Sequence, residues 1–255
     1  MILKTLKKDR LDVYVHDTRA SMGEQVAHDF ANYLRELQKT KDTVNIVFAA
    51  APSQSDFLES LTKEEGIAWD KVNVFHMDEY IGISIDREQS FARFVKTFVA
   101  DRLHVSAFYP LNGAAECIED ECMRYTNLLR TNKIDIVCLG IGENGHIAFN
   151  DPGEADFFDE KDVKIVTLDE KCRNQQVNDK CFETIDDVPK QAMTLTVPAL
   201  MRAGAMFCTV PAATKAWATE RTILGEVDVM CPATALRLHA NAKFYCDSDS
   251  GKALL

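Results

Sequence analysis

Hydrophobic and polar residues recur with two different periods along the chain, and each period predicts one kind of element. Short apolar runs rich in β-branched residues predict buried strands. They occur at residues 11–15, 44–50, 72–77, 134–137, 163–168, 192–197, 205–210 and 242–246. Apolar residues spaced by 3.6 positions predict helices between these runs. Such helices are expected at about 21–38, after residue 56, at about 90–103, at about 116–129 and from about 215 to 223.

Strands that alternate with helices predict an α/β fold, with a mainly parallel sheet and helices on both faces. We expect a single domain over residues 1–255, because no repeat, low-complexity segment or linker divides the chain. The run at residues 242–246 is expected to close the sheet. Residues 169–178 form a polar segment, and residues 247–255 are expected to form a loose tail.

Composition limits the classes of partner. The chain has 255 residues, of which 46% are hydrophobic and 27% charged, and its net charge is −11. This acidic balance disfavours a broad nucleic-acid surface or an anionic membrane as partner, but a small anionic substrate needs only a few local donors. The chain shows neither a signal-peptide pattern nor an apolar run long enough to span a bilayer, so we expect a cytoplasmic protein with no membrane partner.

The eight cysteines carry no metal-binding pattern. None of them forms a C-x-x-C pair, and no nearby histidine completes a zinc motif. We therefore expect eight reduced thiols and no metal site.

Candidate chemistry follows the run at residues 134–137. Three glycines, Gly140, Gly142 and Gly145, frame the position of His146, and Asp151 follows shortly after. Ligands of open α/β sheets bind outside the carboxyl ends of strands, where an imidazole and a carboxylate can exchange protons with a substrate. Taken alone, the same stretch also fits a glycine-rich turn with a structural histidine and a capping aspartate.

Two further strand ends carry polar residues. Asp78 and Glu79 follow the run at residues 72–77, and burial of one near the other would push their pKa values apart. A solvated acidic turn is the alternative interpretation. Residues 51–56 follow the second run and lead into a helix, whose free N–H groups suit a phosphate.

Four separated segments together resemble the glucosamine-6-phosphate deaminase family. They are residues 75–82 (F-H-M-D-E-Y-I-G), 140–152, 188–194, and Lys215-Ala216 with the later Leu238-His239. M-D-E-Y-x-G combined with G-x-G-x-x-G-H-I-A-F-N is specific, and the order and spacing match along nearly the whole chain. The resemblance implies a Rossmann-like fold with its site at the carboxyl edge of the sheet.

The resemblance also implies a reaction. Glucosamine 6-phosphate opens, isomerises from aldose to ketose and loses ammonia to give fructose 6-phosphate, with no cofactor and no catalytic metal. Asp78 matches the family's base, His146 the group that opens the ring, and Asp151 the acidic residue that orients the imidazole. We expect Asn144 to belong to the same catalytic group. The remaining substrate-binding residues are expected to be Ser53, Gln54, Glu79, Gly142, Gly145 and Lys215, with Lys215 at the phosphate and Glu79 also open to a structural role.

The chain departs from the family pattern in three places. Residues 51–56 read A-P-S-Q-S-D where relatives commonly carry P-T-G-G-T-P, and Asp56 would oppose a nearby anion unless it points away. One branch has aspartate where this chain has Asn144, which cannot act as a base, and glutamate is commonest at Asp151. That branch places a phosphate-binding arginine in the segment that corresponds to residues 168–177 here, where Arg173 is near the position but the sequence does not place it in register.

Other functions stay open at this point. A galactosamine-6-phosphate deaminase would need the same catalytic groups, and a sugar-phosphate sensor would keep the pocket without turnover. The related 6-phosphogluconolactonases usually continue G-H as G-H-T-A-S, whereas this chain reads G-H-I-A-F from Gly145, which disfavours that activity. Members of the deaminase family occur as monomers and as hexamers, and the sequence identifies no homo-oligomer interface.

Overall fold

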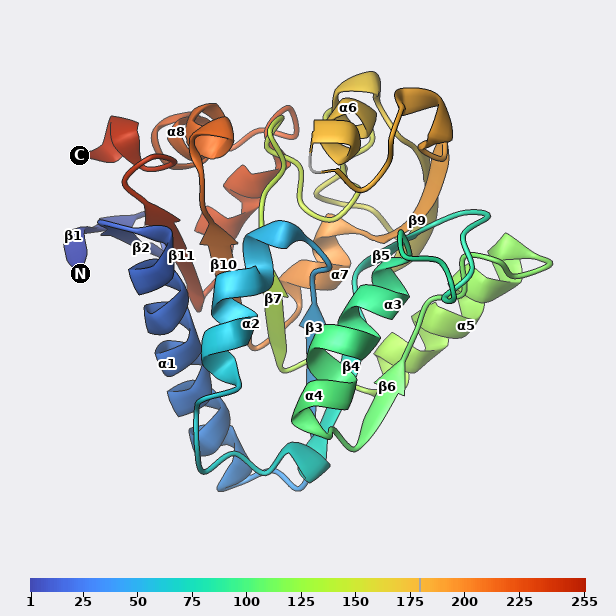
Figure 1. Cartoon of the computed structure of the whole chain (residues 1–255), viewed down its shortest axis with the longest axis horizontal. Coiled ribbons are helices and arrows are strands. Elements are labelled where there is room, and N and C mark those ends of the chain that lie inside the picture. Colours follow the sequence, from blue (N-terminus) through green and yellow to red (C-terminus); the bar gives the residue numbers. More distant parts are fainter. Residues whose placement is uncertain (179) are drawn as a thin grey trace.

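The computed structural model describes residues 1–178 and 180–255, and its centre is a mainly parallel sheet (Figure 1). Among these residues eight strands form the sheet, and every neighbouring pair is parallel except β1 with β2. In spatial order they are β1 (Ile2–Lys8), β2 (Leu11–His16), β11 (Ala242–Asp247), β10 (Ala205–Val210), β7 (Ile136–Leu139), β3 (Val44–Phe48), β4 (Val72–His76) and β6 (Ala107–Tyr109). The predicted α/β class is confirmed.

Helices cover both faces of this sheet, because successive strand side chains point to opposite sides. One face packs against α1 (Arg19–Gln38), α2 (Ser55–Leu61), and α3 (Phe91–Val95), which continues through a π-helical turn at Lys96–Ala100 into α4 (Asp101–Leu103). The other face packs against α5 (Ile118–Thr131), α7 (Val197–Met201) and α8 (Ala216–Leu224). None of the helices in the described part of the chain is long and apolar enough to cross a membrane.

Three strands form a separate antiparallel sheet. They are β5 (Asp78–Tyr80), β9 (Gln191–Leu195) and β8 (Val163–Thr167), with β9 in the middle. The expectation that the two longer runs belong to the main sheet is wrong, and so is the alternative interpretation of Asp78-Glu79 as a solvated turn. The chain instead passes directly from β4 into β5, and Asp78 lies opposite Thr194 of β9.

The carboxyl-terminal region also differs from expectation. β11 lies between β2 and β10 and does not close the sheet, whose edges are β1 and β6. Residues 247–255 are not a loose tail. The Ser250 hydroxyl donates to the Val210 carbonyl at 2.5 Å, and the Asp247 carboxylate accepts from the Ala212 amide at 2.9 Å. The polar segment at residues 169–178 is largely helical, as α6 (Glu170–Asn178).

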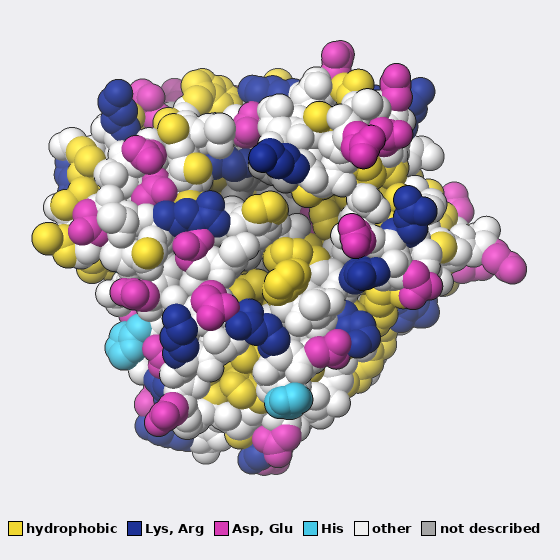
Figure 2. All heavy atoms as spheres, in the orientation of Figure 1, with side chains coloured by type: hydrophobic (Ala, Val, Ile, Leu, Met, Phe, Trp, Pro, Cys, Tyr) yellow, Lys and Arg dark blue, Asp and Glu magenta, His cyan; other side chains and the backbone are white. Residues whose placement is uncertain are grey.

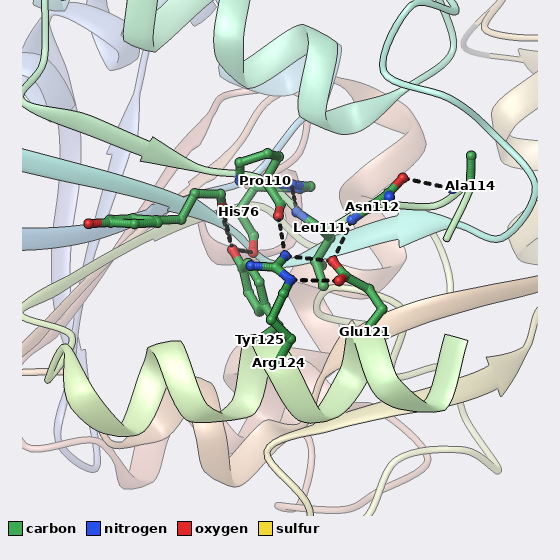
Figure 3. Close-up of polar contacts among 9 residues, drawn as sticks. His76, Pro110, Leu111, Asn112, Ala114, Glu121, Arg124 and Tyr125 are labelled. Carbon is green, nitrogen blue, oxygen red and sulfur yellow. Dashed lines mark hydrogen bonds and ion pairs between the residues drawn. The ribbon is translucent and has the colours of Figure 1, made fainter. Parts of the chain in front are cut away.

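A buried tyrosine ties α5 to the carboxyl ends of β4 and β6 (Figure 3). The hydroxyl of Tyr125 accepts from the His76 amide at 3.0 Å and lies 2.9 Å from the His76 carbonyl and 3.1 Å from the Tyr109 carbonyl. Next to it, Arg124 pairs with Glu121 and donates to the Pro110 carbonyl at 2.7 Å. These contacts fix the point where β4 leaves the main sheet.

We predict that Tyr125→Phe destabilises the fold by about 1–3 kcal/mol, because it leaves the buried amide of His76 without its partner. Chemical denaturation of both proteins would measure the difference. Tyr109→Phe is the control, since its ring is half-buried and stacks on Phe75 with centroids 4.9 Å apart. Equal stability of the Tyr125 variant and wild type would show that the hydroxyl is dispensable.

Candidate active site

A pocket opens where four neighbouring strands of the main sheet end. Its lining includes residues 49–53 after β3, Met77 and Asp78 after β4, Gly140 to Gly142 after β7, and Pro211, Ala212, Thr214 and Lys215 after β10. Figure 2 shows a hollow on this face with Lys and Arg side chains around it. This is the edge at which the sequence placed its candidate residues.

Asp78 reaches the pocket from the first position of β5 and is only 7% exposed. Burial raises the pKa of Asp78 well above its usual value, and the negative charge of Glu79 adds to the effect. The backbone here is held by His76, whose Nδ1 lies 2.9 Å from the Asp78 carbonyl while its Nε2 accepts from the Leu111 amide at 2.8 Å. Burial lowers the pKa of His76 to about 4, so the ring is neutral and donates through Nδ1.

Glu79 points away from the pocket and holds the start of α3. Its carboxylate accepts from the Ser90 hydroxyl at 2.7 Å and the Ala92 amide at 2.9 Å, and also from the amides of Tyr80 and Phe91. Burial raises the pKa of Glu79, and these four donors limit the rise. A carboxylate at a helix N-terminus is also favoured by the helix dipole. Glu79 is therefore placed as a helix anchor that neighbours the site.

His146 lines the pocket, and its ring lies over the backbone of Gly142. A Cβ atom at Gly142 would overlap the imidazole, so only glycine leaves room for the ring in this position. Gly145 has φ +85°, and a Cβ there would lie 2.5 Å from the sulfur of Cys231. Gly142 touches the pocket, whereas Gly145 shapes the turn beneath it.

Asp151 lies behind the imidazole, with its Oδ1 atom 2.8 Å from Nδ1 of His146. Burial alone would raise the pKa of Asp151, but the hydrogen bond and charge of His146, together with the amide of Asn144, lower it below the usual value. Asn144 donates to Asp151 at 2.9 Å and accepts from the His146 amide at 3.0 Å. Asn144 and Asp151 thus hold the imidazole from behind, outside the pocket lining.

A cationic region lies on the side of the pocket nearest β3 and β10. Lys215, at the end of the 3-10 turn before α8, is 8% exposed and lines the pocket together with Ser53. Gln54 is buried, does not line the pocket, and donates to the Ser53 hydroxyl at 3.2 Å. Arg19, the first residue of α1, also lines the pocket.

Sequence reasoning missed Arg19 and the α6 side of the pocket, where Gln175 and Gln176 contribute. One sequence signal could have identified Arg19. A cation at the first position of a helix opposes the helix dipole, and such a placement needs a reason. Gln175 carried no comparable signal, because its segment has only a weak apolar pattern. Arg173 is directed elsewhere: it donates to the carbonyls of Ile185 and Val188, at 2.5 and 3.1 Å.

One group of side chains has the donor types of a metal site. Atoms of His146, Asp151 and Cys172 lie within 4.8 Å of one another, and all three residues are buried. Burial and the charges of Asp151 and Asp169 raise the pKa of the Cys172 thiol, which disfavours the thiolate that a metal would need. All eight cysteines are reduced thiols, as expected.

Comparison with known proteins gives the same family as the sequence motifs. Residues 17–245 match the family described as glucosamine-6-phosphate isomerases/6-phosphogluconolactonase. The chain is 32% identical over 227 residues to a glucosamine-6-phosphate deaminase of Bacillus cereus, covering 89% of this chain and 84% of that protein. A deaminase of the same name from Bacillus anthracis is 31% identical over the same length.

Solved structures agree. A monomeric glucosamine-6-phosphate deaminase superposes with a TM-score of 0.83 at 27% identity, covering 94% of this chain and 98% of that one. The 6-phosphogluconolactonase of Thermotoga maritima superposes with a TM-score of 0.75 at 17% identity, covering 93% and 99%, and this likeness concerns the fold alone. The chain belongs to the glucosamine-6-phosphate isomerase/6-phosphogluconolactonase family.

Proposed function

We propose that this protein is a glucosamine-6-phosphate deaminase, which converts glucosamine 6-phosphate and water into fructose 6-phosphate and ammonia. One observation carries the proposal. Asp78, His146 and Lys215 come from three distant segments of the chain and line a single pocket. A base, a proton-exchanging imidazole and a cation are the groups that this reaction needs. The deaminases of Bacillus cereus and Bacillus anthracis support the assignment.

His146 opens the sugar ring in this proposal. Its Nδ1 atom faces the ionised carboxylate of Asp151, which favours a proton on Nδ1 and leaves Nε2 to exchange a proton with the ring oxygen. A base held by an orienting carboxylate is the usual arrangement in acid–base sites. Asn144 keeps Asp151 in place without taking part in proton transfer itself.

Asp78 moves the proton from C2 to C1 of the opened sugar. Once ionised, a carboxylate with a raised pKa is a stronger base than a solvated one, and Asp78 lines the pocket that would hold the sugar, which supports this role. The resulting imine at C2 adds water and releases ammonia, which leaves the ketose phosphate. A lactone hydrolase has no use for a proton shuttle between two carbons, so this residue supports deaminase chemistry over lactonase chemistry.

Lys215 binds the phosphate of the substrate. Lys215 lies in the turn between β10 and α8, lines the pocket together with Ser53 and is nearly buried. A buried cation attracts an anion more strongly than a solvated one. We also propose that Ser53 donates to the phosphate. Gln54 then acts indirectly, by holding the hydroxyl of Ser53.

The direct test is ammonia release from purified protein supplied with glucosamine 6-phosphate or galactosamine 6-phosphate. We expect ammonia and fructose 6-phosphate in equal amounts from the first substrate. Release from the second alone would keep the mechanism and change the sugar, because the two differ only at C4. Binding of either sugar without ammonia release over hours would identify a sensor and refute the proposal.

Asp78→Asn should abolish most turnover while substrate still binds. General bases contribute about 10²–10⁴-fold to the rate, and the amide matches the carboxyl group in shape.

The Asp78→Asn variant should also be more stable than wild type above mildly acidic pH. The folded pKa of Asp78 exceeds its unfolded value, so its contribution to stability is present at low pH and lost as the pH rises through the folded pKa.

Thermal unfolding against pH, together with steady-state kinetics, would test both expectations for Asp78. Asp162→Asn is the matched control, because Asp162 is equally buried but pairs with Arg130 and Arg202, which lower its pKa. That variant should keep turnover and lose stability at neutral pH. Wild-type turnover in Asp78→Asn would remove Asp78 from the mechanism.

Lys215→Ala should raise KM for glucosamine 6-phosphate about tenfold or more and leave kcat within a few-fold, because a charge-assisted contact to the phosphate is lost. Steady-state kinetics would separate the two constants. Lys171→Ala is the control, since Lys171 lies over the ring of Trp217 at 5.1 Å and does not line the pocket. An unchanged KM would place the phosphate elsewhere.

A further inference from the structure

Arg19 occupies a position that helix energetics disfavour. It is the first residue of α1, where the helix dipole is positive and a carboxylate is preferred, and the first turn of α1 contains no acidic residue. Thr18 caps the helix through its side chain, which accepts from the Ser21 amide at 3.1 Å. The cation therefore adds nothing to the start of the helix, and its neighbours must hold it there.

Two groups from the segment after β3 hold the guanidinium. Its Nε donates to the carboxylate of Asp56, and one Nη2 hydrogen goes to the Pro52 carbonyl at 2.6 Å. A guanidinium has five N–H donors, so three more can reach an acceptor. The side chain is 38% exposed and lines the pocket, whereas Asp56 lies outside the lining. The carboxylate of Asp56 thus holds the guanidinium without itself lining the pocket.

Gly23 allows this contact to form. It lies four residues after Arg19, on the same side of α1. A Cβ atom at this position would lie 2.7 Å from the backbone carbon of Asp56. Only glycine lets the first turns of α1 and α2 approach so closely. The packing of the two helices brings Arg19 within reach of residues 52–56.

The segments after β3 and β10 converge above the end of β7. A Cβ atom at Gly140 would lie 3.1 Å from the Ser53 hydroxyl and 3.3 Å from the Thr209 carbonyl, so both neighbouring strand ends pack against this glycine. Lys215 follows the end of β10, and Arg19 contacts the segment that follows β3. Two cations, one from the turn after β10 and one from the start of α1, therefore border one pocket.

We propose that Arg19, positioned by Asp56, is a second cation of the phosphate site and binds the phosphate monoester of the substrate together with Lys215. The inference rests on the proposed function for the identity of the sugar and on the pocket for the phosphate. It also explains why an aspartate, Asp56, is tolerated in the segment at residues 51–56 that replaces a glycine-rich loop. The carboxylate does not face the anion, because its charge is paired with a guanidinium whose remaining donors serve the phosphate.

Arg19→Gln tests the proposal through two measurements. The dissociation constant of inorganic phosphate, from calorimetry, and KM for glucosamine 6-phosphate should both rise on the order of tenfold. The value of kcat should stay within about threefold, because Arg19 binds far from the reacting carbons. Arg19→Lys should give an intermediate loss, since it keeps the charge and loses the planar fork. Asp56→Asn should weaken binding less than Arg19→Gln, because Asp56 acts through the guanidinium.

Arg35→Gln is the matched control, because Arg35 lies on the same helix and is also ion-paired, with Glu64, but away from the pocket. It should leave both constants unchanged. If Arg19 is merely structural, Arg19→Gln will lower the thermal midpoint without changing phosphate affinity, and the proposal is wrong. A different result would be that Arg19→Gln weakens phosphate binding while the wild-type protein releases no ammonia. That result would support the phosphate site and refute the deaminase activity.

Discussion

The candidate site depends on a single buried transition, where the chain leaves the parallel sheet at His76 and enters the small antiparallel sheet at Asp78. Backbone groups at such a junction lose their ladder partners and must find others, because water cannot reach them. The neutral ring of His76 bridges the Asp78 carbonyl and the Leu111 amide, and the hydroxyl of Tyr125 takes up the His76 backbone. The carboxylate of Asp78 can therefore be buried beside Glu79 in a fixed position. Neutral hydrogen bonds around it maintain the buried position that raises the pKa of Asp78.

The imidazole of His146 is placed by a different constraint, the absence of side-chain atoms. Gly142 leaves space for the ring, and Gly145 turns the chain at positive φ against Cys231. Asp151 and Asn144 then fix the ring orientation from behind. The glycines leave the space in which the imidazole ring lies, and the carboxylate of Asp151 favours the proton on Nδ1. The shorter Asp151 reaches Nδ1 at hydrogen-bond distance, so glutamate is not required here.

Sequence patterns predicted the six interior strands of the main sheet, because these strands are largely buried and read as continuous apolar runs. They did not predict the edge strands β1 and β6, which are more exposed. They did not separate β8 and β9 from that sheet, since pairing partners are set by long-range packing and not by local composition. Ser250 shows the same limit, because its bond to Val210 spans 40 residues. Within the site, motifs identified Asp78 and His146 as candidates. They could not predict where the side chain of Glu79 points, because that depends on how β5 pairs with β9. Arg19 was not predicted as a site residue, because the groups that hold it lie 33 and 37 residues further along the chain.

The overall negative charge of the chain contrasts with the cations that line its pocket. A chain with a net charge of −11 repels anions at long range, so an anionic substrate must gain its binding energy from a few local contacts. A glycine-rich loop would supply backbone N–H groups for this purpose, but the segment at residues 51–56 carries Pro52 and side chains instead. In their place the fold brings Lys215 and Arg19 to one pocket, the first nearly buried and the second held by a carboxylate. Fixed side-chain cations cost more to assemble than backbone amides. The close packing of α1 against α2 at Gly23 positions Arg19 when the chain folds, so the guanidinium is already in place before a ligand binds.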